Sequence, residues 1–163
     1  MPDHCSPLEY IWHLCVGLSS GDIRMVDEKE MGRAKVVARY RNGRIIKGFC
    51  HDFFVNKDRF HLFPPDNPRQ SLGIVMRDLK AVFFVRDFIG DSKYQEKKVF
   101  PDGEKPRGHQ VEVTFADGEV MVGSTSSYGP NREGFFLLPA DPQSNNLRVY
   151  ALATAVQRIR RLS

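Results

Sequence analysis

The sequence predicts a mainly β protein built from two tandem, five-stranded small β-barrels, preceded by a short N-terminal helix. Three observations indicate this fold class. The chain repeats itself at a fixed offset of 75 positions, its apolar residues alternate at period two, and turn pairs separate the alternating runs. At 163 residues, the chain is long enough for one domain or two very small ones.

The internal repeat is ungapped from about residue 36 to residue 72. Its matched positions are mostly glycines, aromatic residues, prolines and apolar residues. The identical pairs are Val36/Val111, Gly43/Gly118, Gly48/Gly123, Phe60/Phe135, Leu62/Leu137, Pro64/Pro139, Asp66/Asp141 and Leu72/Leu147. Such residues recurring at one offset predict an internal duplication.

Each copy begins with a predicted β-hairpin. Apolar residues alternate with polar ones over 36–40 and 111–115, as in half-buried strands, and Asn-Gly or Asp-Gly then supplies the turn. A two-residue loop would pair Tyr40 with Ile45, whereas an inward face that continues through Ile46 needs a longer turn or a bulge. The glycine that follows, 48 or 123, marks a bend where a side chain would collide with the opposing sheet.

Three further strands are expected in each copy. The third lies near "DRFHLFP" and "EGFFLLP", each ended by a proline, which cannot donate to a strand ladder. The fourth and fifth fall within "LGIVMRDLKAVFFV" and "LRVYALATAVQRIRRL". The predicted units are an extension at 1–32, a first barrel at 33–88, a charged linker at 89–107 and a second barrel at 108–163.

The N-terminal extension contains one predicted helix of about three turns. Ser6 is a candidate cap, Pro7 suits the first helical position, Glu9 completes a capping box, and Gly17 ends the pattern. The beginning of the chain is acidic where a signal peptide would be basic, and the longest apolar run is too short to cross a membrane. We therefore expect no membrane insertion. The spacing of Cys5, Cys15 and Cys50 fits neither a disulfide framework nor a paired metal site, which predicts reduced thiols in a cytoplasmic protein.

Basic residues of the first hairpin are the leading candidates for contact with a partner. Where the first copy has Arg39, Arg41, Arg44 and Lys47, the second has Thr114, Ala116, Glu119 and Val122. One unit is expected to hold a contact patch for phosphate or an acidic protein, and the other to support it. Basic residues on exposed strands also serve as a defence against edge pairing. The closing Arg158, Arg160 and Arg161 extend such a patch or keep the terminus soluble.

A second candidate contact site is the loop "PADPQSNNLR". Asp141, Ser144, Asn145 and Asn146 are residues that form Asx-type turns, and Arg148 follows directly. Polar loops on rigid β scaffolds are frequent ligand sites. Asn145, Asn146 and Arg148 are therefore candidate contacts, although a structured turn leading into the next strand explains the same residues.

The chain shows no convincing catalytic, metal or cofactor motif. Cys50 and His51 are adjacent, but neighbouring side chains of a strand point to opposite faces, so a core cysteine beside a surface histidine is favoured. The spacing of His4, Cys5, His13 and Cys15 matches no zinc module. We therefore expect no catalytic residue, no metal and no cofactor.

Five short, bent strands predict a small barrel of SH3-like or Sm-like type. The strand pattern resembles the first two strands of Sm and Hfq-type RNA-binding barrels. The likeness covers about fifteen residues in each copy, around Asn42-Gly43 and Asp117-Gly118. Phe53-Phe54 and Tyr128-Gly129 stand where Sm proteins have an aromatic-Asp pair, and the base-contacting motifs are missing. The resemblance implies strand geometry and does not imply base recognition.

Residues 33–150 are also similar to an uncharacterised group of bacterial domains, through "DLKAVFFVRDF" and "GFFLLPADPQSNNLR". That group is associated with signalling proteins that contain PilZ domains, the receptors for cyclic dinucleotides. The PilZ ligand signature, RxxxR followed by (D/N)xSxxG, is not present in this chain. The resemblance implies a regulatory setting without the known mode of cyclic dinucleotide binding.

These observations favour a non-catalytic bacterial binding module that contacts a partner protein or a small regulatory ligand. A net charge of +4 permits a polyanionic partner without requiring one. The first alternative is Sm-like RNA binding through the basic hairpin, whose affinity would fall steeply with salt. The second is an enzyme that acts through the Cys50 region. The sequence leaves the oligomeric state open.

Overall fold

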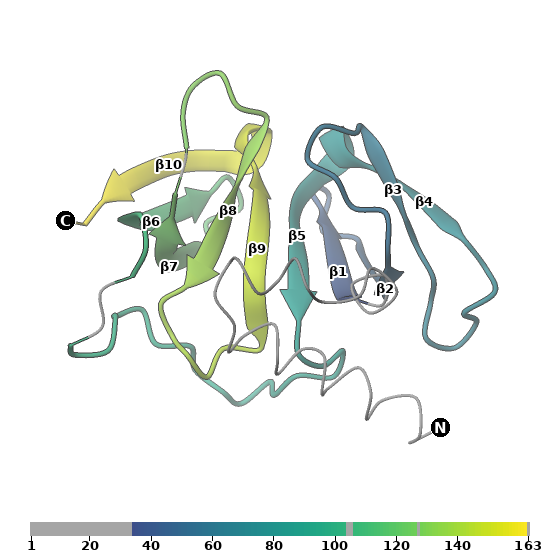
Figure 1. The fold of residues 1–163 in the computed structure, drawn as a ribbon, viewed down its shortest axis with the longest axis horizontal. Coiled ribbons are helices and arrows are strands. Elements are labelled where there is room, and N and C mark those ends of the chain that lie inside the picture. The colour runs from purple at the N-terminus through teal and green to yellow at the C-terminus, as the bar shows by residue number, and fades with distance from the viewer. Residues whose placement is uncertain (1–33, 104–105, 127, 163) are drawn as a thin grey trace.

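The computed structural model describes residues 34–103, 106–126 and 128–162, which form a mainly β fold (Figure 1). The predicted N-terminal helix and the four candidate zinc ligands near it lie outside the described residues. The first half contains β1 Ala34–Tyr40, β2 Ile45–Cys50, β3 Arg59–Leu62, β4 Leu72–Val75, the 3₁₀ turn η2 Met76–Asp78 and β5 Leu79–Val85. The second half contains β6 His109–Phe115, β7 Val120–Thr125, β8 Gly134–Pro139, β9 Asn146–Leu152, the 3₁₀ turn η3 Ala153–Ala155 and β10 Val156–Arg161.

The strands do not form two closed barrels, so that part of the predicted fold class is wrong. Eight strands make one sheet in the order β10-β6-β7-β8-β9-β5-β1-β2, and β3 pairs only with β4 in a separate two-stranded sheet. A bridge between Phe49 and Phe63 links β2 to the end of β3. Instead of each half closing on itself, β9 of the second half pairs with β5 of the first, at the centre of Figure 1.

β5 and β9 form a wall between two hydrophobic cores. Along β5, Val82 and Phe84 face the core of the first half, whereas Ala81, Phe83 and Val85 face that of the second. Every residue of β5 is consequently buried. A strand covered on both faces needs a continuous apolar run, which explains why "AVFFV" does not alternate.

β9 contributes to both cores in the same way. Val149 and Ala151 pack in the second core, and Tyr150 and Leu152 pack in the first. The two halves therefore share hydrophobic side chains as well as backbone hydrogen bonds. The predicted linker runs beneath them and contains no strand or helix within its described residues (Figure 1).

The two hairpins have corresponding bounds, because β6 and β7 begin and end 75 residues after β1 and β2. The turns are longer than two residues: Arg39 lies opposite Ile45, and the Tyr40 amide donates to the Arg44 carbonyl at 2.8 Å. Gly43 and Gly118 have φ values of 92° and 93°, which a side chain would strain. The longer turn places Ile46 opposite Ala38 on the inward side, the second of the two registers expected from the sequence.

Candidate functional site

The outward side of the first hairpin carries a mixture of basic and apolar side chains. We call it the hairpin face; its residues are Lys35, Val37 and Arg39 of β1 with Ile45, Lys47 and Phe49 of β2. These residues lie opposite one another in the register of the two strands, on the side away from the core residues Val36 and Ala38. Ile45 remains 48% exposed.

A hollow of about 220 Å³ adjoins the hairpin face and contains residues from both regions that the sequence singled out. Its apolar walls come mainly from β5 and the segment after it, and its polar rim comes from β1, β2, the β6–β7 turn and the β8–β9 loop. The lining residues are Val37, Arg39, Ile45, Lys47, Phe83, Val85, Asp87, Phe88, Ile89, Glu119, Asn145 and Asn146. The structure thus brings four of the seven candidate contact residues to one place.

The cations around this hollow are held by the chain itself. The Arg39 guanidinium lies 3.2 Å from a carboxylate oxygen of Glu119 and 5.0 Å from the centre of the Phe83 ring. The Lys47 ammonium donates to the Phe88 carbonyl at 2.7 Å. The hollow therefore presents an apolar surface bordered by fixed positive charge, and Glu119 shows that its rim accepts a carboxylate.

The acidic turn of the second hairpin packs against the first half through a buried lysine. Lys80 of β5 is buried and bonds Asp117 at 2.7 Å and Glu119, with its ammonium 4.7 Å from the centre of the Phe115 ring. The hydrogen bond from Lys80 lowers the pKa of Asp117 below its usual value. Charge thus fixes the second hairpin against the first half.

Arg41 and Arg44 lie at the exposed turn of the first hairpin. The Arg44 guanidinium is 5.6 Å from the centre of the Tyr40 ring. Within the described part of the chain, neither arginine forms an ion pair. Both charges are therefore available to an acidic partner that reaches the hairpin.

Asn145 serves the fold directly. Its side-chain oxygen accepts from the Asp87 amide at 3.1 Å, and its side-chain nitrogen donates to the Asp87 carbonyl at 2.9 Å. The Arg86 amide in turn donates to the Asn145 carbonyl at 2.9 Å. Asn145 therefore clamps the segment after β5 that forms one wall of the hollow.

Arg148 lies on the opposite side of the sheet from Asn146. Residues two apart in a regular strand share a face, but the ladder shifts register here, because Phe84 pairs with Arg148 and Val85 with Asn146. The Arg148 guanidinium lies 4.3 Å from the centre of the Phe84 ring and 4.8 Å from that of Phe136. It thus belongs to a different surface from the hollow.

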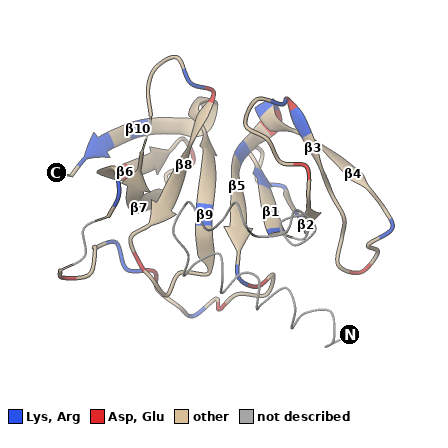
Figure 2. Ribbon diagram, viewed as in Figure 1, with Lys and Arg blue, Asp and Glu red and all other residues tan. Residues whose placement is uncertain are grey.

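The arginines of β10 do not extend the hairpin face. β10 and β2 are the two ends of the eight-stranded sheet, and the basic residues of β10 lie at the far side of the molecule (Figure 2). Arg160 forms two hydrogen bonds with Glu112, at 3.2 and 2.9 Å. The patch suggested by the sequence is therefore confined to the first hairpin.

Asp141 explains the unusual composition of the β8–β9 loop. Its carboxylate is buried and accepts hydrogen bonds from the Tyr94 hydroxyl and from the amides of Lys97 and Gln143, the last two at 2.8 Å. Burial alone would raise the pKa of Asp141, but these donors together hold it below its usual value. The loop is a structured turn that ties Tyr94 and Lys97 of the predicted linker to the sheet.

Cys50 is buried, and the His51 ring stacks on the Phe63 ring at 5.0 Å. Burial is the main cause that raises the pKa of the Cys50 thiol to about 12. The thiol donates at 3.7 Å to Asp52, whose carboxylate also bonds the His61 ring at 2.6 Å. A buried thiol with so high a pKa is a poor nucleophile, despite this histidine and carboxylate nearby.

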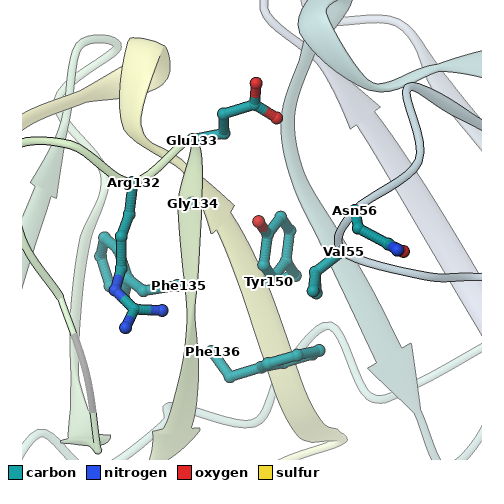
Figure 3. Close-up of a pocket in the computed structure, with 8 residues that line it drawn as sticks. All are labelled: Val55, Asn56, Arg132, Glu133, Gly134, Phe135, Phe136 and Tyr150. Atoms are coloured by element: carbon teal, nitrogen blue, oxygen red, sulfur yellow. The ribbon is translucent and has the colours of Figure 1, made fainter.

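A second pocket, of about 420 Å³, lies between the halves on the other side of the sheet (Figure 3). Val55 and Asn56 of the β2–β3 loop face the start of β8 across it, with the rings of Phe136 and Tyr150 between them. We call it the front pocket; Arg132, Glu133, Gly134 and Phe135 complete its lining.

The aromatic floor of the front pocket is part of the packed core. The Phe136 and Tyr150 rings lie 5.0 Å apart, and both approach the Phe53 ring, at 6.2 and 5.5 Å. The polar residues Arg132 and Glu133 stand at its exposed edge (Figure 3). The pocket has room for an apolar group, but packing alone accounts for its rings.

In the described ranges, no three His, Cys, Asp or Glu side chains are grouped so that they could hold a metal ion. Nor does any described helix have the length and apolar character needed to cross a membrane.

Several residues of the hollow were not identified from the sequence. Three of them, Phe83, Phe88 and Ile89, lie within the seven residues after "DLKAV". Only the folded structure shows that they border the basic hairpin. Glu119 was noted only as the counterpart of Arg44. The repeat itself carried the missing signal, because an acidic turn facing a basic hairpin suggests contact between them.

Comparison with known proteins adds a family and no activity. A family model described as a family of unknown function (DUF6982) matches residues 32–163. The matched region includes all ten strands, the hairpin face and both pockets. No curated protein and no solved structure matches the chain.

Proposed function

Because the chain belongs to a family of unknown function over residues 32–163, we propose a function from the site alone. The protein is a non-catalytic module that binds a partner protein through the hairpin face and the adjoining turn, which carries Arg41 and Arg44. The observation that carries the proposal is charge. Residues 34–50 contain five basic residues and no acidic one, whereas the equivalent residues 109–125 contain three acidic residues and no lysine or arginine.

The composition of the surface favours a protein partner over RNA. Exposed Ile45 and Ile89, the latter 88% exposed, give the hollow an apolar border of the kind found at protein interfaces. The cations nearest the hollow already bond Glu119 and a backbone carbonyl. RNA binding would instead use free cations and aromatic rings on which bases can stack.

We further propose that the two halves arose by duplication and then divided their tasks. Support comes from the identical pairs at offset 75 and from the corresponding bounds of the two hairpins. In this proposal the second hairpin supports the first, which contacts the partner. The cytoplasmic and bacterial signalling setting is also a proposal and rests on the sequence resemblance.

Panning a library of random octapeptides against the full chain tests the proposed function. We expect enriched peptides rich in Asp and Glu, and we expect the double variant R41E/R44E to lose at least tenfold in affinity for them. The matched control R69E/R77E makes the same charge change at exposed arginines of the β3–β4 ribbon and its adjoining turn, and should bind normally.

The RNA alternative is tested with labelled single-stranded poly-uridine over a salt series. No binding at low salt is expected. Tight binding to the RNA that weakens steeply with salt, together with no peptide enrichment, would show that the proposed function is wrong.

A further inference from the structure

The outer edge of β2 has backbone groups that no described part of the chain pairs. The Phe49 amide and carbonyl bond Phe63, at 2.8 and 2.9 Å, so the backbone of Phe49 points away from β1. Successive residues of a strand direct these groups to alternate edges, so those of Ile45 and Lys47 point the same way as those of Phe49. Among the described residues, β3 reaches this edge only at Phe63.

The second half pairs more of the same edge, because β8 forms a ladder with Gly123 and Ser124 of β7. The Ala140 amide donates to the Val122 carbonyl at 3.0 Å, and Val122 is the counterpart of Lys47. The counterpart of Ala140 is Pro65, which has no N–H to donate. The chain turns away at this point, with the Asn67 amide bonded to the Pro64 carbonyl at 3.2 Å.

We propose that this open edge pairs with an extended, acidic segment of the partner protein, which adds a strand to the sheet beside β2. The inference rests on the proposed function and specifies how the partner binds. Pairing with Ile45 and Lys47 offers two donors and two acceptors, as in other complexes formed by strand addition. Side chains on one side of the added strand would lie beside the hairpin face.

Charge favours an acidic partner over a second copy of this chain. Antiparallel pairing of two β2 edges would bring two hairpins together, each with five basic residues and no acidic one. An acidic strand would instead meet Arg41 and Arg44, which lack ion-pair partners among the described residues. Lys47 does not guard the edge in the usual way, because its ammonium is bonded to the Phe88 carbonyl.

N-methylated versions of an enriched octapeptide test the pairing from the ligand side. Methyl groups on alternate amides of the peptide remove all N–H donors from one of its two edges. They also prevent that edge from approaching β2 closely enough to pair. One of the two alternate series should bind at least tenfold more weakly, and the other should bind like the unmodified peptide. Equal binding by both series would overturn the pairing.

The variant Pro65→Ala tests it from the protein side. Alanine supplies a backbone N–H at the position where its counterpart Ala140 bonds the Val122 carbonyl. The segment after β3 can then bond the Lys47 carbonyl and occupy the edge, so peptide affinity should fall at least fivefold. The control is Pro64→Ala, at a position where both halves have proline. The Phe63 amide faces β2, so the nitrogen of the next residue faces away, and this variant should bind normally.

The outcomes separate the inference from the function on which it rests. If R41E/R44E weakens binding while Pro65→Ala and both methylated series bind normally, the hairpin face binds the peptide without strand pairing, and this inference is wrong. If no peptide is enriched above an unrelated control protein, the inference and the proposed function both fail.

Discussion

The two hairpins of this protein share an inner side and differ on the outer side. Val36 and Val111 are both fully buried, and Gly48 and Gly123 hold the same place in β2 and β7. Outside, the first hairpin is basic and, apart from the buried Lys35, at least partly exposed. The second is acidic at its turn and bonded to Lys80. Packing constrains the inner positions of both hairpins and leaves the outer positions free to differ.

The largest difference between the hairpins is expected at the paired glycines. A Cβ at Gly123 would lie 2.2 Å from the Leu138 carbonyl oxygen, whereas one at Gly48 would lie 2.9 Å from that of Phe63. Gly123→Ala should lower the free energy of unfolding by about 3 kcal/mol and Gly48→Ala by about 1 kcal/mol, because the added methyl group overlaps a backbone carbonyl in both cases but much more deeply at Gly123. Urea denaturation measures both, and equal losses would contradict the difference in packing.

The paired aspartates that follow β3 and β8 should differ next. Asp141 accepts three hydrogen bonds while buried, whereas its counterpart Asp66 is exposed. Asp141→Asn should lower the free energy of unfolding by about 2 kcal/mol, and Asp66→Asn should lower it by less than about 0.5 kcal/mol.

The pH dependence of stability provides the check on Asp141. Its pKa is depressed in the folded state, so the stability it contributes is present above its ordinary unfolded pKa and is lost as pH falls through the folded value. The difference in free energy of unfolding between wild type and Asp141→Asn should therefore disappear in acid. If this difference in free energy of unfolding stays constant down to the pH at which the protein unfolds, the carboxylate charge does not contribute to stability.

A smaller effect is expected at His61, whose counterpart in the second half is Phe136. His61 donates its amide to Asp52 at 2.9 Å and bonds the same carboxylate through its ring. Burial would raise the pKa of Asp52, but the His61 bonds outweigh burial and lower it. Because the pair is partly exposed, His61→Ala should cost only about 1 kcal/mol near neutral pH.

The effect of His61→Ala should shrink as pH falls from the ordinary carboxyl pKa through the depressed folded value of Asp52. Thermal unfolding at several pH values measures it. The control Asp52→Asn should remove the same pH dependence of stability. If both variants keep that pH dependence, it comes from another titratable group.

The sequence predicted the local elements better than their assembly. The hairpins followed from short-range signals: alternation, a turn glycine and a bend glycine at fixed spacing. Two closed barrels did not follow, because pairing between distant strands decides closure, and β9 pairs with β5. The unbroken run in β5 was the one local sign that this strand is covered on both faces.

The candidate contacts were predicted to a similar extent. Arg39 and Lys47 share the hollow with Asn145 and Asn146, but Asn145 is occupied by the backbone of Asp87. Arg148 lies on the other side of the sheet because the pairing of β5 with β9 shifts register between Phe84 and Val85. No residue pattern in the sequence indicates this shift. The exchange of Ala140 for Pro65 was visible in the repeat, but its meaning depends on which strand edge each residue faces.

The most direct test of the central claim, that the first hairpin contacts the partner and the second supports it, is an NMR titration of the labelled full chain with an enriched octapeptide. We expect shift changes concentrated in Arg39–Lys47, slower exchange of the Lys47 amide, and little change over β6 and β7. Changes concentrated instead in 109–125, or around Gly134–Phe136 in the front pocket, would contradict it.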